Sequence, residues 1–330
     1  MKNCYNPCFL CPRDCGAYRS YLKKHTIGYC GETASLRIAC ASIHKGEEPP
    51  ITAIDKIGEN SKGGGSGTIF VSGCNLGCIF CQNYQISSHT APAILGRTVE
   101  TAEFAEICLQ LQKKGAENIN IVTGSHAVPA IIEGIASAKA VGLNIPILWN
   151  SSAYELPETL EMLEETVDVF LPDLKTLDSS ISTRFFNAPD YPAIATRAIK
   201  KMLEMRSLRF AQDREKIVSG VMIRHLVLPG FLPASREVLC WYKDHCAGKA
   251  LLSLMFQFTP LDLTSVSDRY ISRSEYETVL GWLNELGIED GYCQELVPGN
   301  IDWLPDFEKE NPFPSDLSIP VWHWKTGFIH

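Results

Sequence analysis

The chain has 330 residues, of which 45% are hydrophobic and 21% are charged, the composition of an ordinary globular protein. Its net charge of −8 argues against broad non-specific binding to nucleic acid or to anionic membranes. No apolar run is long enough to span a bilayer, and the start at Met1 lacks the apolar stretch of a signal peptide. We therefore expect a soluble cytoplasmic protein with no membrane or nucleic-acid partner.

The first sixty residues show no convincing long helix or strand, and a glycine-rich breaker follows at 63–67. Beyond it, short apolar and β-branched runs predict six strands, at 68–71, 118–122, 145–149, 167–171, 220–228 and 252–258. Amphipathic stretches between them predict helices at 101–115, 127–142, 155–166, 192–206 and 234–247. This alternation predicts an α/β fold with a parallel sheet, either open and doubly wound or closing as a (β/α) barrel.

Cysteine is unusually common, with 13 residues. In a chain without an export signal, such cysteines more often bind metal or do redox chemistry than form disulfides. Cys74, Cys78 and Cys81 form C-x3-C-x2-C shortly after the first predicted strand. Three thiolates at this spacing can hold three irons of a four-iron cluster and leave the fourth iron free for another ligand. A zinc site would need a fourth ligand nearby, which residues 83–85 do not offer.

The triplet, with Phe80 as the aromatic residue before its last cysteine, resembles the signature of the radical S-adenosylmethionine (SAM) enzymes. The resemblance implies a partial (β/α)6 TIM-like barrel, here with a Cys-rich N-terminal extension and a C-terminal wrap. It also implies a [4Fe–4S] cluster whose open iron is chelated by SAM. Reduction would then cleave SAM to a 5′-deoxyadenosyl radical that abstracts hydrogen from a substrate.

Polar, glycine or proline residues follow each predicted strand, which is where barrels of this type place their active site. They are Cys74, 123–126, 150–151, 173–175, 229–230 and 257–260. Among them we expect cofactor contacts from Gly124, His126, Asn150 and Gln257. The alternatives are an ordinary loop histidine for His126 and a core amide satisfied by the backbone for Gln257.

Over its whole length the chain is similar to the PflX-like group of pyruvate formate-lyase activating enzyme-like proteins. The matching pieces are the triplet and residues 11–16, 28–31, 149–151, 171–175 and 224–230. The resemblance implies that Lys175 contacts the SAM carboxylate and that Asp173 supports it. Two departures weaken the transfer of the activase function: residues 123–126 replace Gly-Gly-Glu after the second strand, and Asn150-Ser151 replaces Asp-Thr after the third.

Arg224 and His225 are neighbours in the fifth predicted strand, so their side chains point to opposite faces of the sheet. We expect Arg224 to line the barrel as a catalytic candidate beside Lys175 and Asp173. A buried charge must be paired, and an anionic ligand is one partner that would satisfy it.

A second cysteine set lies near the N-terminus: Cys8, Cys11, Cys15 and Cys30, with Cys4 as a spare. Two closely spaced pairs brought together by a loop predict a closed four-thiolate site for zinc, and the same four could hold an auxiliary iron–sulfur cluster. Such a metal would stabilise a segment that is poor in regular structure.

These observations predict three parts: a metal-binding segment at 1–60, a radical SAM barrel at 61–265, and a helix with a Pro/Trp-rich wrap at 266–330. The expected function is SAM-dependent radical chemistry on an unidentified small-molecule or protein substrate, with a reductant such as flavodoxin or ferredoxin. One alternative is a glycyl-radical-enzyme activase. A non-catalytic iron–sulfur electron carrier or scaffold is the other.

Overall fold

The computed structural model describes residues 4–19, 27–54, 64–87, 93–212, 216–261, 266–297, 299 and 301–329. Six parallel strands form the centre of its sheet: β2 (Ser66–Val71), β4 (Ile119–Val122), β5 (Ile147–Ser151), β6 (Val169–Pro172), β8 (Ile217–Leu226) and β9 (Leu251–Met255). Each overlaps a strand predicted from the sequence, and the six lie side by side in chain order. The prediction of an α/β fold with a mostly parallel sheet is confirmed.

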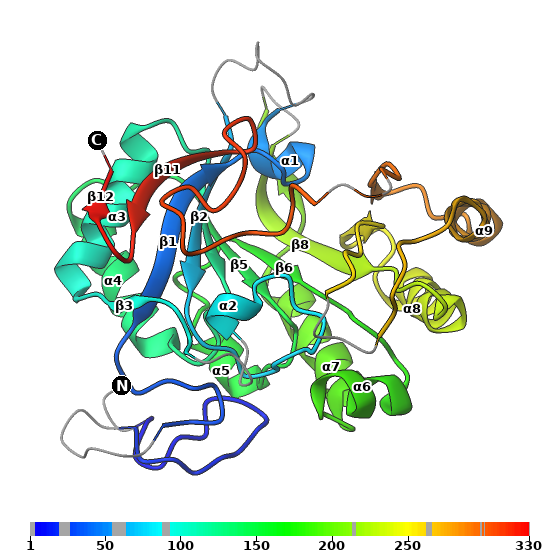
Figure 1. Cartoon of the computed structure of the whole chain (residues 1–330), viewed down its shortest axis with the longest axis horizontal. Helices are drawn as coiled ribbons and strands as arrows, with labels where there is room; N and C mark the ends of the chain where they lie inside the picture. Colours follow the sequence, from blue (N-terminus) through cyan, green and yellow to red (C-terminus); the bar gives the residue numbers. More distant parts are fainter. Residues whose placement is uncertain are drawn as a thin grey trace.

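The sheet curves but does not close into a barrel (Figure 1). At one edge, β10 (Gly291–Cys293) pairs in parallel with β9. At the other edge, β12 (Gly327–Phe328) pairs with β11 (Ser318–His323). The fold is therefore a partial barrel whose sheet stays open between these two edges.

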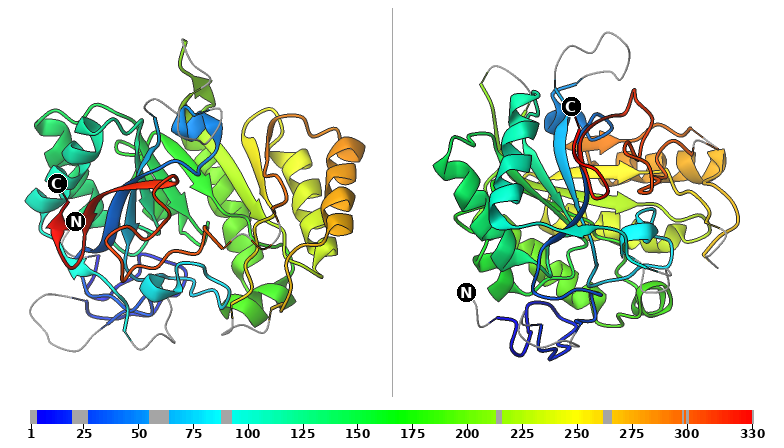
Figure 2. Two further views of the ribbon diagram at one scale, coloured as in Figure 1. Left: turned by 45° about the horizontal axis from the view of Figure 1, so that its top comes forward. Right: turned by 60° about the vertical axis from the view of Figure 1, so that its left-hand side comes forward.

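Helices cover the outer, convex face of this sheet (Figure 2). They are α3 (Thr101–Lys113), α4 (Val128–Ala140), α5 (Pro157–Glu161), α6 (Ser179–Phe186), α7 (Tyr191–Met205) and α8 (Leu232–His245). Phe104 of α3, Ile131 of α4 and Ile199 of α7 join Trp149 of β5 in the main hydrophobic core. Burial of these apolar faces is the main force that holds helices against strands.

Two helices differ from the prediction. The helix expected at 155–166 ends at Glu161, because the following backbone bonds tighten to an i→i+3 pattern such as Thr166 N to Leu163 O at 2.9 Å. Helix α6 was not predicted. Asp178 caps its N-terminus: the carboxylate accepts hydrogen bonds from the backbone of Ser180 and Ile181, a capping signal that the sequence does contain.

Strand β1 (Arg37–His44) shows that the prediction of no strand in the first sixty residues is wrong. Its residues after Arg37 are buried on both faces, so no alternation of polar and apolar residues marks it. It pairs antiparallel with β2 and with β11. The N-terminal part thus contributes to the same sheet as the barrel part, and the three-part division of the chain stays a prediction.

The C-terminal part returns across the sheet after α9 (Arg273–Leu286), which packs beside α8 (orange to red in Figure 1). Phe307 and Phe313 then pack against Phe70 of β2, with ring centroids 5.3 and 5.6 Å away, in a cluster that includes Cys40 of β1. This segment covers the inner face at the β1 and β2 end of the sheet.

Short elements complete the fold: α1 (Pro49–Thr52), α2 (Tyr84–Ser87), β3 (Arg97–Thr98) and β7 (Arg209–Phe210). β3 pairs with β1, and β7 pairs with β8. Across the described ranges, none of the helices has the length and apolar character needed to cross a membrane.

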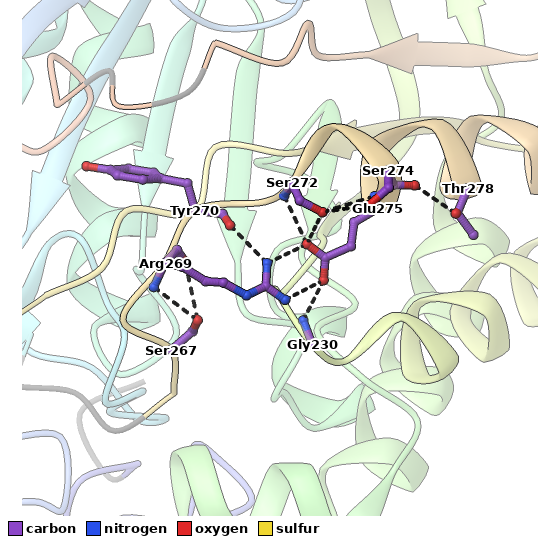
Figure 3. A network of polar contacts seen from close by, with 8 residues as sticks. All are labelled: Gly230, Ser267, Arg269, Tyr270, Ser272, Ser274, Glu275 and Thr278. Atoms are coloured by element: carbon purple, nitrogen blue, oxygen red, sulfur yellow. Dashed lines mark hydrogen bonds and ion pairs between the residues drawn. The ribbon is translucent and has the colours of Figure 1, made fainter.

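Glu275 fastens the start of α9 to the turn that follows β8 (Figure 3). Its carboxylate accepts hydrogen bonds from Gly230 N at 2.8 Å, from Ser272 N at 2.9 Å and from both terminal nitrogens of Arg269 at 2.6 and 2.8 Å. Ser272 completes a capping box by accepting from Glu275 N. The hydrogen bonds from Arg269 and from these backbone groups hold the pKa of Glu275 well below its ordinary value of 4.5.

We expect Glu275→Gln to lower the free energy of unfolding by about 1–2 kcal/mol at neutral pH, because the neutral amide loses the charge-assisted hydrogen bonds from Arg269. The depressed pKa gives the sign of the pH dependence. The contribution of Glu275 is fully present above its unfolded-state pKa and is lost as the pH falls towards its folded-state pKa. Denaturant melts should therefore show a clear gap between wild type and variant at pH 7 and a smaller gap at pH 3, which lies between the two pKa values. An equal gap at both values would contradict this assignment.

Candidate active site

Cys74 begins the triplet loop directly beyond β2. Gly73 and Gly77 flank it with φ angles of +85° and +67°, a conformation that glycine adopts without strain. The Cys74 sulfur accepts hydrogen bonds from Leu76 N at 3.3 Å and Gly77 N at 3.5 Å. Backbone N–H groups aimed at a sulfur are the environment in which proteins hold cluster thiolates.

Phe80, the aromatic residue of the motif, anchors the same loop. It is buried and meets the rings of Phe185, Phe186 and Phe258 at centroid distances of 6.1, 6.4 and 6.5 Å. The three partner rings come from α6 and from the segment after β9. Phe80 therefore ties the loop to both, and the aromatic position of the motif has a packing role in this protein.

Lys175 lies beside the triplet, close enough for its charge to act on Cys78 and Cys81. Its ammonium forms an ion pair with Asp173 at 2.7 Å. Its backbone N–H donates to the Tyr191 hydroxyl at 2.9 Å, and that hydroxyl donates to the Asp173 carbonyl at 2.7 Å. Burial lowers the pKa of Lys175, but Asp173, Cys78 and Tyr191 together more than reverse this shift, so the lysine stays charged.

Arg224 lies on the inner face of the sheet, next to Asp173 on the neighbouring strand. Its side chain is 7% exposed and forms ion pairs with Glu47 and, at 2.5 Å, with Glu48. Both carboxylates come from the segment between β1 and α1. The expected anionic partner is thus supplied by the chain itself. His225 points the other way, to Ser235 of α8 at 2.9 Å, as the alternation of a strand requires.

Each of the two glutamates also accepts a hydrogen bond from a neighbouring strand. Glu47 accepts from Asn120 of β4 at 3.2 Å, and Glu48 accepts from Ser253 of β9 at 2.5 Å. Charges consequently alternate along the inner face from Lys175 through Asp173 and Arg224 to Glu47 and Glu48. This row runs from the triplet loop to the segment that precedes α1.

The turn after β4 is strained where the sequence predicts cofactor contacts. Thr123 has a φ of +64°, which is rare for a β-branched residue. A Cβ on Gly124 would lie 2.5 Å from the Trp149 ring, so the backbone packs directly on that ring. His126 is buried, and its Nε2 lies 2.8 Å from the Ser72 carbonyl while its Nδ1 has no partner among the described residues. Burial and the nearby Arg19 lower the pKa of His126 to about 3, so the ring is neutral.

Glu155 joins the ends of β4 and β5. Its carboxylate is 1% exposed and accepts from Ser125 Oγ at 2.7 Å, Trp149 Nε1 at 2.8 Å and Ser151 Oγ at 2.6 Å. Burial raises the pKa of Glu155, and the three donors oppose that shift. Asn150 lies within this strand end, and its carbonyl accepts from Thr123 N at 2.9 Å.

Gln257 follows β9 and also contacts the triplet loop, since its carbonyl accepts from Gln82 Nε2 at 3.1 Å. Its side-chain oxygen accepts from Gln294 Nε2 at 3.0 Å. The structure thus pairs this amide with another amide. A cofactor contact from Gln257 stays a prediction.

The N-terminal cysteines lie against this site rather than apart from it. Cys30 O accepts from Cys74 N at 3.1 Å, and Cys8 and Cys30 are buried while Cys15 is exposed.

Within the described part of the chain, no group of three or more His, Cys, Asp or Glu side chains is arranged to hold a metal ion, and this applies to the triplet as well.

Residues 68–237, more than half of the chain, match the sequence profile of the Radical SAM superfamily. The chain belongs to the radical SAM superfamily. Members of this superfamily are enzymes, and membership implies a [4Fe–4S] cluster and SAM as cofactors. The residues present fit that pair: three cysteines on one loop, backbone donors on the Cys74 sulfur, and a lysine beside the cysteines.

Similar proteins include MJ0674, an uncharacterized protein of Methanocaldococcus jannaschii, which is 27% identical over 269 residues. The alignment covers 78% of this chain and 68% of the relative. Among solved structures, a radical SAM methyltransferase from Sphaerobacter thermophilus superposes with a TM-score of 0.49 at 15% identity, covering 72% of this chain and 69% of that one. Streptococcus suis SuiB bound to precursor peptide SuiA gives 0.48 at 14% identity, covering 67% of this chain. The matched part is 46% of the SuiB chain, so this radical SAM protein spans about half of SuiB.

Several residues of the site were not found from the sequence: Glu47, Glu48, Glu155 and Tyr191. Glu155 had a signal, since it lies six residues after a predicted strand end and a buried carboxylate there needs donors. Glu47 and Glu48 had none, because only the folded chain brings the segment after β1 to Arg224 of β8.

Proposed function

We propose that this protein cleaves SAM reductively at a [4Fe–4S] cluster held by Cys74, Cys78 and Cys81 and uses the 5′-deoxyadenosyl radical to abstract hydrogen from a substrate. The observation that carries the proposal is the three-cysteine loop beyond β2 with the charged Lys175 beside Cys78. Residues from the ends of β4, β5 and β6 provide polar groups near the same edge of the sheet, where ligands of such folds bind.

In this proposal Lys175 binds the SAM carboxylate, and Asp173 and Tyr191 orient it. The lysine is held by two hydrogen bonds, one through its ammonium and one through its backbone N–H. Gly124, Asn150 and the neutral His126 line the cofactor from the ends of β4 and β5. The buried Nδ1 of His126, which lacks a partner among the described residues, is available for a ligand hydrogen bond.

We infer that the substrate is a small molecule or a modified peptide and that the electron donor is a small redox protein such as flavodoxin or ferredoxin. The PflX-like resemblance supports the alternative, an activase that abstracts hydrogen from a backbone glycine of a partner enzyme. The two differ in an observable way. An activase leaves a glycyl-radical EPR doublet on its partner, whereas an enzyme acting on a small molecule turns over without one.

The proposal predicts that anaerobically reconstituted, reduced protein forms 5′-deoxyadenosine from SAM. Lys175→Ala should weaken SAM binding by about 10- to 100-fold, because one charge-assisted hydrogen bond contributes about 1.5–3 kcal/mol. Lys201→Ala is the matched control, since Lys201 pairs with Glu161 on the surface, away from the triplet. Equilibrium binding of SAM to both variants measures the difference. Equal affinities would contradict the role given to Lys175.

A further inference from the structure

Four cysteines of the N-terminal segment gather at one place in the fold. Cys11 lies within electrostatic range of Cys8, Cys15 and Cys30. Tight turns shape the backbone around them, with Asp14 at φ +44°, Gly16 at +58° and Gly31 at +83°. These turns bring the two short Cys-bearing stretches into one region of the fold, although the four thiols are not arranged around a common metal position in this structure. Four thiolates drawn together there would make a closed tetrahedral site.

Arg19 is buried among these cysteines. Its guanidinium, 2% exposed, donates to Cys8 Sγ at 3.5 Å and to the carbonyls of Thr33 at 2.5 Å, Glu32 at 3.1 Å and His126 at 2.9 Å. No carboxylate accepts from it in these bonds; the carboxylate of Glu32 lies within electrostatic range but forms its ion pair with Arg37, at 2.8 Å. A buried cation needs a compensating negative charge, and metal-bound thiolates supply that charge where neutral thiols do not.

The N-terminal segment that carries these cysteines also forms hydrogen bonds with the triplet loop. Arg13 donates to Asn75 O at 2.8 Å and Leu76 O at 3.0 Å, and also to the carbonyls of Phe186 and Asn187 at 2.7 and 2.5 Å. Its guanidinium lies 4.1 Å from the centre of the Tyr29 ring, next to Cys30. Cys74, the first cysteine of the triplet, donates its N–H to Cys30 O. The N-terminal segment therefore contacts the triplet loop directly at two places, through Arg13 and through the Cys30 carbonyl.

We propose that Cys8, Cys11, Cys15 and Cys30 form a second metal centre with four thiolate ligands, and that this centre positions the triplet loop through Cys30 and Arg13. Arg19 is its charge-compensating neighbour. Zinc and an auxiliary iron–sulfur cluster both take four thiolates. Because metal binding draws flexible ligands together, the centre closes when it is loaded. The inference goes beyond the proposed function, since it concerns metal content and not SAM cleavage.

Metal counting tests the centre directly. Anaerobically purified Cys78→Ala protein, in which the triplet is disabled, should retain about one zinc per chain or about four irons with matching sulfide. The ratio of zinc to iron and sulfide identifies which metal is held. Cys11→Ala/Cys15→Ala in the same background should lose that metal, whereas Cys240→Ala, a partly buried cysteine of α8, should keep it. A Cys78→Ala protein without bound metal would overturn the proposal, whether or not the double variant folds.

Arg13 is a positioning residue, and its variant tests the connection between the two centres. Arg13→Ala should keep the N-terminal metal yet shift the EPR spectrum of the reduced triplet cluster and lower its iron occupancy. Arg13→Lys should restore the EPR spectrum and the iron occupancy only in part, because lysine lacks the planar guanidinium that donates to several carbonyls at once. An unchanged cluster spectrum in a folded, metal-loaded Arg13→Ala protein would overturn the positioning role.

Discussion

Cys78→Ala is expected to lower 5′-deoxyadenosine formation by at least about 100-fold, since removing a cluster ligand costs more than removing the groups that only orient one. Cys78 belongs to the triplet loop and lies in range of Lys175, Asp173 and its two companion cysteines. Its loss leaves two thiolates, too few to hold a site-differentiated four-iron cluster. The iron content assigned to the triplet and its EPR signal should fall together with the product.

Cys293→Ala serves as the control for this experiment because Cys293 is an exposed cysteine on β10. It should retain both cluster and product. If Cys78→Ala kept wild-type levels of 5′-deoxyadenosine, the triplet would not be the site of SAM cleavage.

Arg224→Met should lower the free energy of unfolding by about 3–5 kcal/mol, because it leaves two buried carboxylates without a cation to pair with. Glu47 and Glu48 are 14% and 11% exposed, and Arg224 is the cation paired with both. Burial alone raises the pKa of Glu48, and Arg224 together with hydrogen bonds from Ser253 and the backbone reverses that shift. Denaturant unfolding at neutral pH measures the loss. Adding Glu47→Gln and Glu48→Gln to the variant should recover much of it.

Arg236→Met is the matched control for that variant. Arg236 pairs with Glu285 on the surface, where the two side chains are 45% and 56% exposed. Such a pair contributes about 1 kcal/mol or less. A similar loss in both variants would show that the buried row of charges is not what stabilises this side of the sheet.

The parallel part of the sheet could be predicted from sequence because each strand carries its own local signal. Runs such as 118–122 and 167–171 are apolar and β-branched, and turn residues bound them. The cysteine triplet could be recognised equally well, since its three cysteines lie within eight consecutive residues, 74–81, on a single loop. The resemblance to radical SAM enzymes drawn from it is confirmed by the family match.

What could not be predicted depends on contacts between distant parts of the chain. The strand β1 is covered on one face by the helical core and on the other by Phe307 and Phe313, so its composition shows no alternation. Strand geometry predicted that Arg224 and His225 point to opposite faces of the sheet, yet the partners of Arg224 at 47 and 48 lie more than 170 residues away. Ion pairs between residues so far apart in the sequence can be predicted only once the order of the strands in the sheet is known.

EPR of the reduced protein with and without SAM tests the central claim most directly. Anaerobically reconstituted wild type should give a [4Fe–4S]⁺ signal whose g-values shift when SAM is added, because SAM would occupy the iron that no cysteine holds. Cys78→Ala protein should give no such signal from the triplet. A fully reconstituted cluster whose spectrum is the same with and without SAM would contradict the account and favour an electron-carrying or scaffold role for the protein.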